Sequence, residues 1–486
     1  MVEVDLGPKS VAVVGAGLVG CLLGVYLRKH GFVVEFFESR RDPRLGMETG
    51  RSINLVITSR GINALTGLSE EVAEKIMAIT TRVEGRTLHD KEGKTLYQSY
   101  GPDDTYCNFS VSRWELNCVL MTAAEDAGCK FHFNSPLQHI DIPSAKLYFY
   151  LMEGGSLFQK VVTATHVFGA DGGGSRCRQA NKGLNGEAGE DRGLPLGFGY
   201  KELTMPALEG GVPPAHKDSL HIWPRGTHFM MGLYNRDGSF TMTLYAPNKA
   251  EKEGDVAFGD IKTEEDVTAL FQEHYADAMP LMPAYKEEFL TNPVGFLGTV
   301  FTKPWVHGEK FALIGDAAHA FTPFFGQGCN SGFEDVAIFH ELLTDMQGGG
   351  ELDMARLFQL YYEERKPNTD AIANMALDNF EEMMSKTADR RFQIEQDIQN
   401  ELAALDASYK SRYVLITHSL LPYHLCQEAG VVQQTILTQL SEGLDDAANF
   451  DRALAKRLLE EHWKPFLTKH AITPARCHYS SKYYEK

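Results

Sequence analysis

The feature that most constrains this chain is a glycine-laced turn near its start, in the stretch VAVVGAGLVG at residues 11–20. Gly15, Gly17 and Gly20 follow an apolar strand with the spacing G-x-G-x-x-G. In that arrangement the first glycine allows a tight turn, the second lets the backbone approach a pyrophosphate, and the third lets a helix pack on the strand. The sequence therefore predicts a strand, a turn and a helix whose N-terminus binds a dinucleotide.

An acidic residue ends the next predicted strand. Residues 11–38 are predicted as strand, glycine turn, helix and strand, with Glu38 as the last residue. A carboxylate there hydrogen-bonds ribose hydroxyls and disfavours a 2′-phosphate. The dinucleotide is therefore expected to be FAD or NAD and not NADP, with a purely structural glycine turn as the alternative.

Charge and cysteine content restrict the partners and the compartment. Among 486 residues, 47 are Lys or Arg and 65 are Asp or Glu, which gives a net charge of −18. Nucleic acids and anionic membranes favour basic surfaces, so neither is expected as a partner. Eight cysteines without C-x-x-C pairs favour a reducing compartment and no zinc site, and no other metal site is expected. A cytoplasmic location is expected, with peripheral association with mitochondria as the alternative. A membrane anchor is not expected, since the sequence has no apolar run of about 20 residues.

Secondary-structure patterns change along the chain. Helices are predicted over 70–79 and 113–127, and Thr263 is predicted as a helix N-cap. Residues 196–245 alternate apolar and polar side chains around an NRDG turn, which is typical of β-hairpins. Helical periodicity dominates after Leu352.

Two more glycine motifs follow predicted strands. VFGADGGGSRCR at 167–178 contains Asp171, and LIGDAAHA at 313–320 contains Gly315 and Asp316. With the N-terminal fingerprint they resemble the aromatic-hydroxylase class of flavoprotein monooxygenases. The resemblance implies FAD as the cofactor, with Asp316 at its ribityl chain. It also implies that the segment around Asp171 serves both FAD and a transient nicotinamide nucleotide.

The resemblance also implies a fold of the α/β class. A Rossmann-like FAD-binding domain is expected from residues 1–80, 108–190 and 296–345. A β-sheet substrate domain is expected from 81–107 and 191–295, and a C-terminal helical region from 346–486.

The segment GDAAHAFTPFFGQGCNSG at 315–332 resembles the loop that wraps the isoalloxazine ring in this class. Pro323 fixes the turn, Gly326 and Gly328 bring peptide N–H groups close, and a helix beginning near Asn330 directs its positive end to the same place. Phe324 and Phe325 suit either the apolar core or a place beside the reacting ring, where they would exclude water. His319 is predicted to be a packed, hydrogen-bonded residue, and His89 and His221 are predicted to be structural.

Four segments resemble the kynurenine 3-monooxygenase family more closely. They are RSINLVITSRG (51–61), SVSRWELN (110–117), LHIWPR (220–225) and PFFGQGCNSGFED (323–335). The resemblance implies hydroxylation of L-kynurenine to 3-hydroxy-L-kynurenine by NADPH and O2 through a C4a-hydroperoxyflavin. The chain departs from the family at Cys329, where a methionine is usual, and at 430–486, where animal members carry an apolar anchor.

The same resemblance assigns site residues. Arg86 is the candidate for the substrate carboxylate, with Tyr100, Asn379 and Tyr413 as hydrogen-bonding partners. Taken singly, Arg86 also suits a surface salt bridge and Tyr413 suits helix packing. Phe325, Pro323 and Gly326 are assigned to the reacting centre. The cofactor contacts expected are Gly15, Gly17, Leu18, Val19, Gly20, Glu38, Arg40, Arg113, Asp171, Gly315, Asp316, Gly328, Cys329 and Asn330.

Two alternatives stay open: an FAD hydroxylase of another aromatic acid, and a non-catalytic FAD-binding protein. The protein is expected to be a monomer or a homodimer.

Overall fold

The computed structural model describes residues 2–46, 54–101, 103–153, 156–252, 254–348, 352–381 and 390–485. Residues 51–53 of the RSINLVITSRG motif lie outside the described residues. The chain divides into two compact units. Unit 1 holds residues 1–79, 111–195 and 298–373, and unit 2 holds residues 80–110, 196–297 and 374–486.

Unit 1 is built on a six-stranded sheet of order β19-β20-β13-β2-β3-β9. All neighbours are parallel except the pair β19–β20. The central strand β2 is buried along its whole length, as expected for a parallel strand covered on both faces. The strands are β2 (Ser10–Val14), β3 (Val33–Phe37), β9 (Lys130–His132), β13 (His166–Gly169), β19 (Val306–His307) and β20 (Phe311–Leu313).

Helices and a second sheet complete unit 1. The four-stranded sheet has the order β1-β12-β11-β10, with β1 (Val2–Asp5), β10 (Leu137–Asp141), β11 (Lys146–Glu153) and β12 (Ser156–Thr163). The helices are α1 (Leu18–Lys29), α2 (Ser59–Leu68), α3 (Glu70–Met77), α4 (Arg113–Asp126), α5 (Arg176–Asn185), α8 (Asp316–His319) and α9 (Gly328–Gln347). Helix α10 (Met354–Glu381) begins in unit 1, and the predicted helices at 70–79 and 113–127 are confirmed as α3 and α4.

A seven-stranded sheet of order β18-β14-β17-β16-β15-β6-β7 supplies the frame of unit 2. Its strands are β6 (Gly85–His89), β7 (Thr95–Ser99), β14 (Glu190–Met205), β15 (Ser219–Pro224), β16 (Phe229–Tyr234), β17 (Phe240–Pro247) and β18 (Gly295–Lys303). The NRDG turn joins β16 to β17 in an antiparallel hairpin, as predicted. Short β5 (Thr81–Val83) pairs with β8 (Asn108–Ser112).

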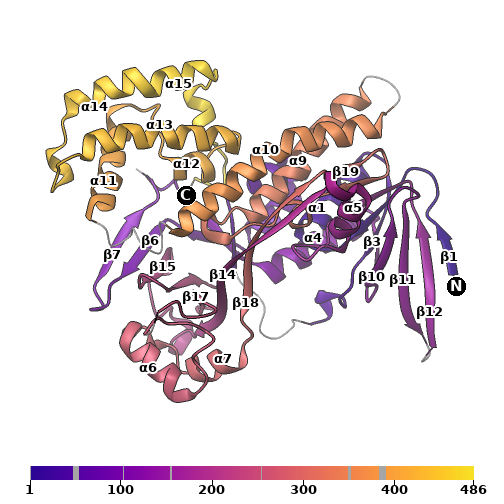
Figure 1. The fold of residues 1–486 in the computed structure, drawn as a ribbon, viewed down its shortest axis with the longest axis horizontal. Coiled ribbons are helices and arrows are strands. Elements are labelled where there is room, and N and C mark those ends of the chain that lie inside the picture. Colours follow the sequence, from indigo (N-terminus) through magenta and orange to yellow (C-terminus); the bar gives the residue numbers. More distant parts are fainter. Residues whose placement is uncertain are drawn as a thin grey trace. The chain divides into compact units, whose positions relative to one another are not determined.

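Helices α6 (Glu264–His274) and α7 (Tyr285–Thr291) close the core of unit 2 (Figure 1). Met230, Met242 and Leu244 of the sheet pack with Phe271 and Phe289 of these helices. Thr263 caps α6 through a capping box, which confirms the predicted N-cap.

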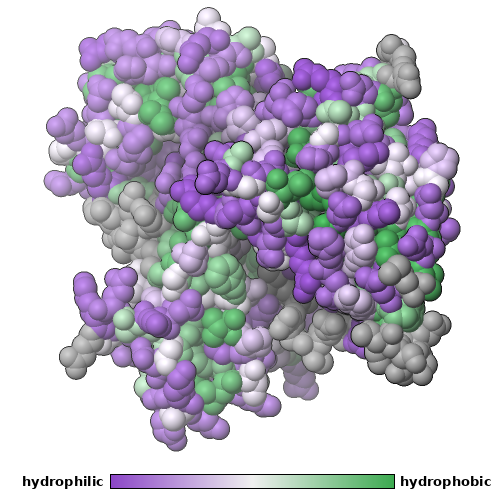
Figure 2. Space-filling model, turned by 45° about the vertical axis from the view of Figure 1, so that its right-hand side comes forward, coloured by the Kyte–Doolittle hydropathy of each residue, from purple (hydrophilic) through white to green (hydrophobic). Residues whose placement is uncertain are grey.

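Helices predominate at the C-terminal end of unit 2. They are α11 (Arg390–Leu405), α12 (Arg412–Thr417), α13 (Tyr423–Ser441), α14 (Arg452–Leu458) and α15 (Lys464–Lys469). Of the helices in the described ranges, none is both long and apolar enough to span a bilayer. Hydrophilic residues dominate the face drawn in Figure 2, with smaller hydrophobic groups between them.

Candidate active site

The first glycine motif forms the turn from β2 into α1. Gly15 has a φ of +97°, and a Cβ there would lie 2.5 Å from the carbonyl oxygen of Ala170. Gly17 is the N-cap of α1, and a Cβ on it would meet no atom of the described residues within 4 Å. Helix α1 starts without a side-chain cap, so its first N–H groups are available to an anion.

Glu38 stands at the end of β3 beside this turn. Its Oε2 accepts a hydrogen bond from the Ala16 N–H at 2.9 Å, and its Oε1 accepts from the Arg40 N–H and from Arg40 Nε, both at 2.9 Å. Burial by itself raises the pKa of Glu38, but the hydrogen bonds from Arg40 and Ala16 outweigh it and hold the pKa below its usual range. An ionised carboxylate therefore stands beside the glycine turn.

The three glycine motifs come together in unit 1. A Cβ on Gly20 would lie 3.3 Å from the Cβ of Ala170, which precedes the D-G motif. The side chain of Val19 lies against the G-D motif and α9, because a Cβ on Gly315 would meet it at 3.1 Å and one on Gly332 at 2.5 Å. Segments far apart in sequence therefore surround the N-terminus of α1.

The D-G motif is fixed by its own polar side chains. Asp171 accepts hydrogen bonds from two backbone N–H groups in the first turn of α5 and from Ser175 Oγ at 2.5 Å. Buried Arg178 donates to the carbonyl of Gly173 at 2.7 Å and to that of Ala317 at 3.1 Å. Arg178 thus joins the D-G motif to α8, the helix that begins at Asp316 of the G-D motif.

A fully buried aspartate on α9 sets the G-D turn. Gly315 has a φ of +61°, and its N–H donates to Asp335 Oδ2 at 3.0 Å. His319 Nε2 lies 2.6 Å from the same oxygen, and Arg365 Nε donates to Oδ1 at 2.8 Å. Burial raises the pKa of Asp335, but His319 and Arg365 bring the net pKa below its usual value. The prediction that His319 is a packed, hydrogen-bonded residue is confirmed.

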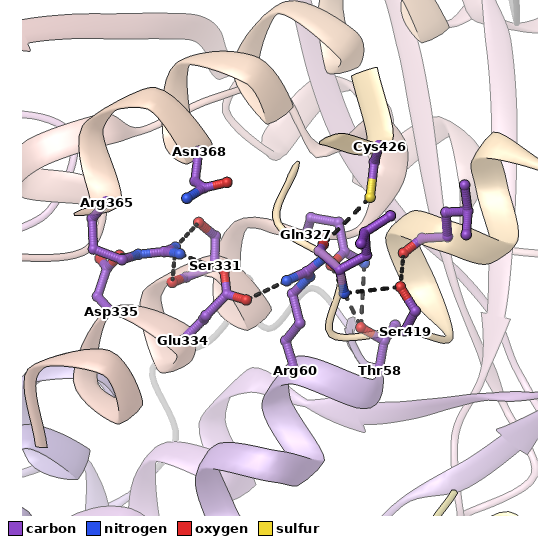
Figure 3. A network of polar contacts seen from close by, with 12 residues as sticks. Thr58, Arg60, Gln327, Ser331, Glu334, Asp335, Arg365, Asn368, Ser419 and Cys426 are labelled. Atoms are coloured by element: carbon purple, nitrogen blue, oxygen red, sulfur yellow. Dashed lines mark hydrogen bonds and ion pairs between the residues drawn. The ribbon is translucent and has the colours of Figure 1, made fainter. Parts of the chain in front are cut away.

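Buried charges around this aspartate are paired, as Figure 3 shows. Arg60 of α2 forms an ion pair with Glu334, and Arg365 of α10 contacts the other oxygen of Glu334 at 2.6 Å. Arg60 and Arg365 are only 1% and 2% exposed. Because removing one partner would leave a buried charge unpaired, this network fixes the first turns of α9 to α2 and α10.

The loop before α9 is held by its own backbone and by Asn330. Residues Pro323–Phe325 form one 3₁₀ turn, and Gly326 follows with a φ of +63°. The Asn330 side chain bonds the carbonyl of Gly326 at 2.9 Å and two backbone groups of the β4–α2 segment, where β4 is Asn54–Ile57. Helix α9 begins at Gly328 without a side-chain cap, and a Cβ on Gly328 would meet no described atom within 4 Å.

Asp316, Arg113 and Cys329 share one neighbourhood. Asp316 and Arg113 are exposed at the starts of α8 and α4. Burial raises the pKa of Cys329 to about 12, with Asp316 adding to the rise and Arg113 opposing it. Each of the three was predicted to contact the cofactor, and all of them lie in unit 1.

These features fit a bound dinucleotide. Two long helices, α1 and α9, start at glycine-rich turns without side-chain caps. Space next to Gly17 and Gly328 is not filled by described protein atoms, and the Glu38 carboxylate lies beside the first glycine turn. By contrast, α3, α4, α5 and α6 each begin with a serine or threonine that caps the helix. The uncapped helix starts are therefore suited to bind an anionic ligand.

Three predicted substrate residues lie together in unit 2. Arg86 is half-buried on β6, and Tyr100 directly follows β7. The rings of Tyr100 and Tyr413 stack with centroids 5.2 Å apart. Burial raises the pKa of both tyrosines, and the positive charge of Arg86 opposes part of that rise. A cation and two phenols, from segments more than 300 residues apart, thus form one group.

Gln98 positions the arginine of this group. Arg86 and Gln98 are opposite each other in the β6–β7 ladder, and Arg86 Nε donates to Gln98 Oε1 at 2.8 Å. A small hollow lies beside them, and its other lining residues are Leu88 and the α11 residues Phe392, Gln393 and Gln396. Asn379, the fourth predicted residue, is half-buried on the part of α10 that belongs to unit 2.

Comparison with known proteins identifies the family. The family model described as "FAD binding domain" matches residues 9–376. A kynurenine 3-monooxygenase of Myxococcus xanthus is 40% identical over 95% of this chain and 97% of its own length. The enzyme of the same name from Stenotrophomonas maltophilia is 36% identical over 92% of this chain and 95% of its own. The chain belongs to the kynurenine 3-monooxygenase family.

Solved structures agree with the fold of this family. A 2-methyl-3-hydroxypyridine-5-carboxylic acid oxygenase superposes with a TM-score of 0.60 at 17% identity, over 81% of this chain and 97% of that one. A tetracycline destructase superposes with a TM-score of 0.56 at 18% identity, over 90% and 98%. The predicted α/β class with a Rossmann-like FAD-binding fold is confirmed.

Sequence reasoning did not assign the roles of four residues that hold the candidate site together. Arg178 and Asp335 fix the two later glycine motifs, and Gln98 and Asn108 support the Arg86 group. Asp335 and Asn108 were detectable only as polar residues inside apolar stretches. Their partners are distant in sequence, and no local pattern names them.

Proposed function

We propose that this protein hydroxylates L-kynurenine to 3-hydroxy-L-kynurenine, consuming NADPH and O2 with FAD as cofactor. The overall reaction takes one NADPH, one proton and one O2, and gives NADP⁺ and one water beside the product. The observation that carries the proposal is the grouping of Arg86, Tyr100 and Tyr413 in unit 2 of a chain that is 40% identical to a kynurenine 3-monooxygenase.

Arg86 is proposed to bind the substrate carboxylate. A guanidinium presents two parallel N–H groups that match a carboxylate, and such pairs are among the stronger hydrogen bonds in proteins. Gln98 occupies Arg86 Nε, which leaves the terminal nitrogens to be oriented toward a ligand. Tyr100, Tyr413 and Asn379 are proposed to add hydrogen bonds to the same carboxylate.

Unit 1 is proposed to hold FAD, and unit 2 to bind the substrate. The N-terminus of α1 at Gly17 would take the pyrophosphate, and Glu38 the adenosine ribose. The backbone at Gly328, Cys329 and Asn330 would face the flavin ring, with Asp316 at the ribityl chain. When bound, FAD supplies the electron transfer from NADPH and the activation of O2. Two further sets of roles stay predictions. One is contact with the reacting ring by Pro323, Phe325 and Gly326. The other is contact with FAD by Leu18, Val19, Arg40, Arg113 and Asp171.

The substrate's own chemistry makes a protein base unnecessary for oxygen transfer. The ortho amino group of kynurenine already donates electron density to the ring. A phenolic acid, the substrate class of the nearest rival function, would instead need a proton acceptor near its hydroxyl. NADPH as the reductant, a monomeric or homodimeric state and a cytoplasmic location remain part of this proposal.

Purified protein tests the proposal directly. NADPH oxidation and hydroxylated product are followed together with L-kynurenine and with a panel of phenolic acids. Kynurenine-dependent oxidation with an equal amount of 3-hydroxykynurenine is expected. Product from a phenolic acid alone would support the rival hydroxylase, and bound FAD without any aromatic-dependent oxidation would support a non-catalytic FAD protein.

A further inference from the structure

Strand β8 carries two buried polar side chains whose oxygen atoms are unpaired. Asn108 and Ser110 are 4% and 1% exposed. Asn108 Oδ1 and Ser110 Oγ have no hydrogen-bond partner within the described part of the chain. Because side chains alternate along a strand, these two residues point to the same side of β8. Buried unpaired polar atoms cost stability, so a pair of them on one face calls for a ligand.

The Asn108 side chain lies beside the Arg86 group, and Ser110 is two residues farther along the same strand. Asn108 Nδ2 donates to the hydroxyl of Tyr413 at 2.9 Å, and Asn108 also lowers the pKa of neighbouring Tyr100 through a hydrogen bond that partly offsets burial. In the β5–β8 ladder Asn108 is opposite Val83, three residues before Arg86. The free acceptor therefore adjoins the side chains proposed to bind a carboxylate.

We propose that Asn108 Oδ1, with Ser110 Oγ as a second acceptor, binds the α-ammonium group of the amino-acid substrate. This inference rests on the proposed function and adds to it the recognition of the second charged group. An ammonium group has three N–H donors and no acceptor, so it needs the kind of atom that these residues leave unpaired. It is attached to the same carbon as the carboxylate, so its acceptor must adjoin the carboxylate site.

The other amino group of kynurenine fits this position less well. The ring amino group lies at the opposite end of the molecule from the carboxylate. Asn108, in contrast, is hydrogen-bonded to Tyr413, which is itself proposed to bind the carboxylate. The neutral amide also suits the place, since an acidic residue there would repel the carboxylate that Arg86 binds. Asn108 and Ser110 thus make the site selective for an α-amino acid over a simple carboxylic acid.

Asn108→Leu tests the inference with three ligands. Dissociation constants are measured by calorimetry for L-kynurenine, for its desamino analogue 4-(2-aminophenyl)-4-oxobutanoate, and for 3-benzoylalanine, which lacks the ring amino group. Loss of a hydrogen bond to a charged group is expected to weaken kynurenine and benzoylalanine by about ten- to a hundredfold. Binding of the desamino analogue is expected to change little, and the FAD content to stay as in the wild type.

Two further variants serve as controls. Asn117→Leu removes another asparagine with a buried unpaired Oδ1, on α4 of unit 1, and is expected to leave the ligand preference unchanged. Asn108→Asp keeps an acceptor in nearly the same shape. Asn108→Asp is expected to bind kynurenine more tightly than Asn108→Leu does. It is expected to bind the desamino analogue more weakly than the wild type does, because its carboxylate would repel that of the analogue.

Several results would overturn the inference. An equal loss for all three ligands would mean that Asn108 only supports Tyr413. A loss for kynurenine and the desamino analogue, with benzoylalanine unaffected, would mean that Asn108 binds the ring amino group. Wild-type protein that binds none of the three would contradict the proposed function itself, and this inference with it.

Discussion

The two proposed sites are built from different materials. In unit 1 the site consists mainly of backbone: glycine turns and two uncapped helix starts, with Glu38 as its acid. In unit 2 the site consists of side chains from distant segments, namely Arg86, Tyr100, Asn108 and Tyr413. A backbone site needs small residues at fixed local spacing. A side-chain site needs only that the fold bring the right groups together.

This difference predicts how the two sites fail. Changes at the tightly packed turns of the backbone site should affect the folding of unit 1, because these turns are also part of its core. Changes at the side-chain site should affect ligand affinity and leave the fold intact. The sites can therefore be separated by measuring stability and binding on the same variants.

Substitutions of two glycines in the same turn are expected to have different effects, one on folding and the other on FAD binding. Gly15→Ala is expected to disrupt unit 1 and abolish FAD retention, because the new Cβ would lie 2.5 Å from a backbone oxygen at a φ of +97°. In Gly17→Ala the new Cβ would meet no described atom within 4 Å, so the thermal unfolding of the FAD-free protein should match that of the wild type. The affinity for FAD should fall, because the Cβ would occupy the space proposed for the pyrophosphate. Equal loss of stability in both variants would contradict the distinction.

Asp335→Asn should be the most damaging single loss of charge in unit 1. The variant leaves Arg365 and His319 without their buried carboxylate, and a cost of about 3–5 kcal/mol in the free energy of unfolding is expected. Denaturant unfolding measures it. Asp345→Asn on the exposed side of the same helix is the matched control, with a change expected within about 0.5 kcal/mol. A cost as small for Asp335 would mean that the network does not hold α9.

Acid should open unit 2 before unit 1. Burial lowers the pKa of His221 to about 4 and those of His228 and His418 to about 3, and all three belong to unit 2. An unfolded histidine has a pKa of about 6.5, so below that pH the unfolded chain binds protons that the folded unit excludes. Stability should then fall by about 1.4 kcal/mol per pH unit for each histidine, down to its folded pKa.

Hydrogen exchange, corrected for the intrinsic effect of pH, follows each unit separately. In unit 1 the pKa values of Glu38 and Asp335 are lowered in the folded state. The stability that these two carboxylates contribute is present above the unfolded carboxyl pKa of about 4, and it is lost only as the pH falls below that value. Peptides of unit 2 should therefore lose protection first as the pH falls from about 6.5 to 4. His228→Phe should reduce that sensitivity. Earlier opening of unit 1 would contradict the account.

Gln98→Leu should have the smallest effect. It removes the acceptor of Arg86 Nε but leaves the guanidinium in place, so the dissociation constant for L-kynurenine should rise by about tenfold or less. The FAD content and the unfolding temperature should stay unchanged. A loss as large as that of an Arg86 variant would mean that Gln98 touches the substrate itself.

The sequence predicted the backbone site more completely than the side-chain site, for a physical reason. The strand, turn and helix around Gly15 follow from neighbouring residues, as does the capping box at Thr263. Resemblance to a family was needed to connect Arg86 with Tyr413. Hydrogen bonds such as that from Gly315 to Asp335 depend on tertiary packing, which no local pattern contains.

The packing of the C-terminal helices could not be predicted from the local sequence pattern either. Periodicity after Leu352 predicted helices, and the structure has them. Which unit a helix joins is decided by side-chain packing across long distances in sequence. Helix α10 begins in unit 1 and ends in unit 2, and its hydrophobic spacing alone does not mark that change.

The most direct test of the central claim is the affinity of Arg86→Met for L-kynurenine, measured beside Arg86→Lys. Removing the guanidinium should raise the dissociation constant by about a hundredfold or more, since the substrate carboxylate loses its charged partner. Lysine should recover part of the loss, and FAD content should equal that of the wild type in both variants. An unchanged dissociation constant in Arg86→Met, with FAD still bound, would contradict the account.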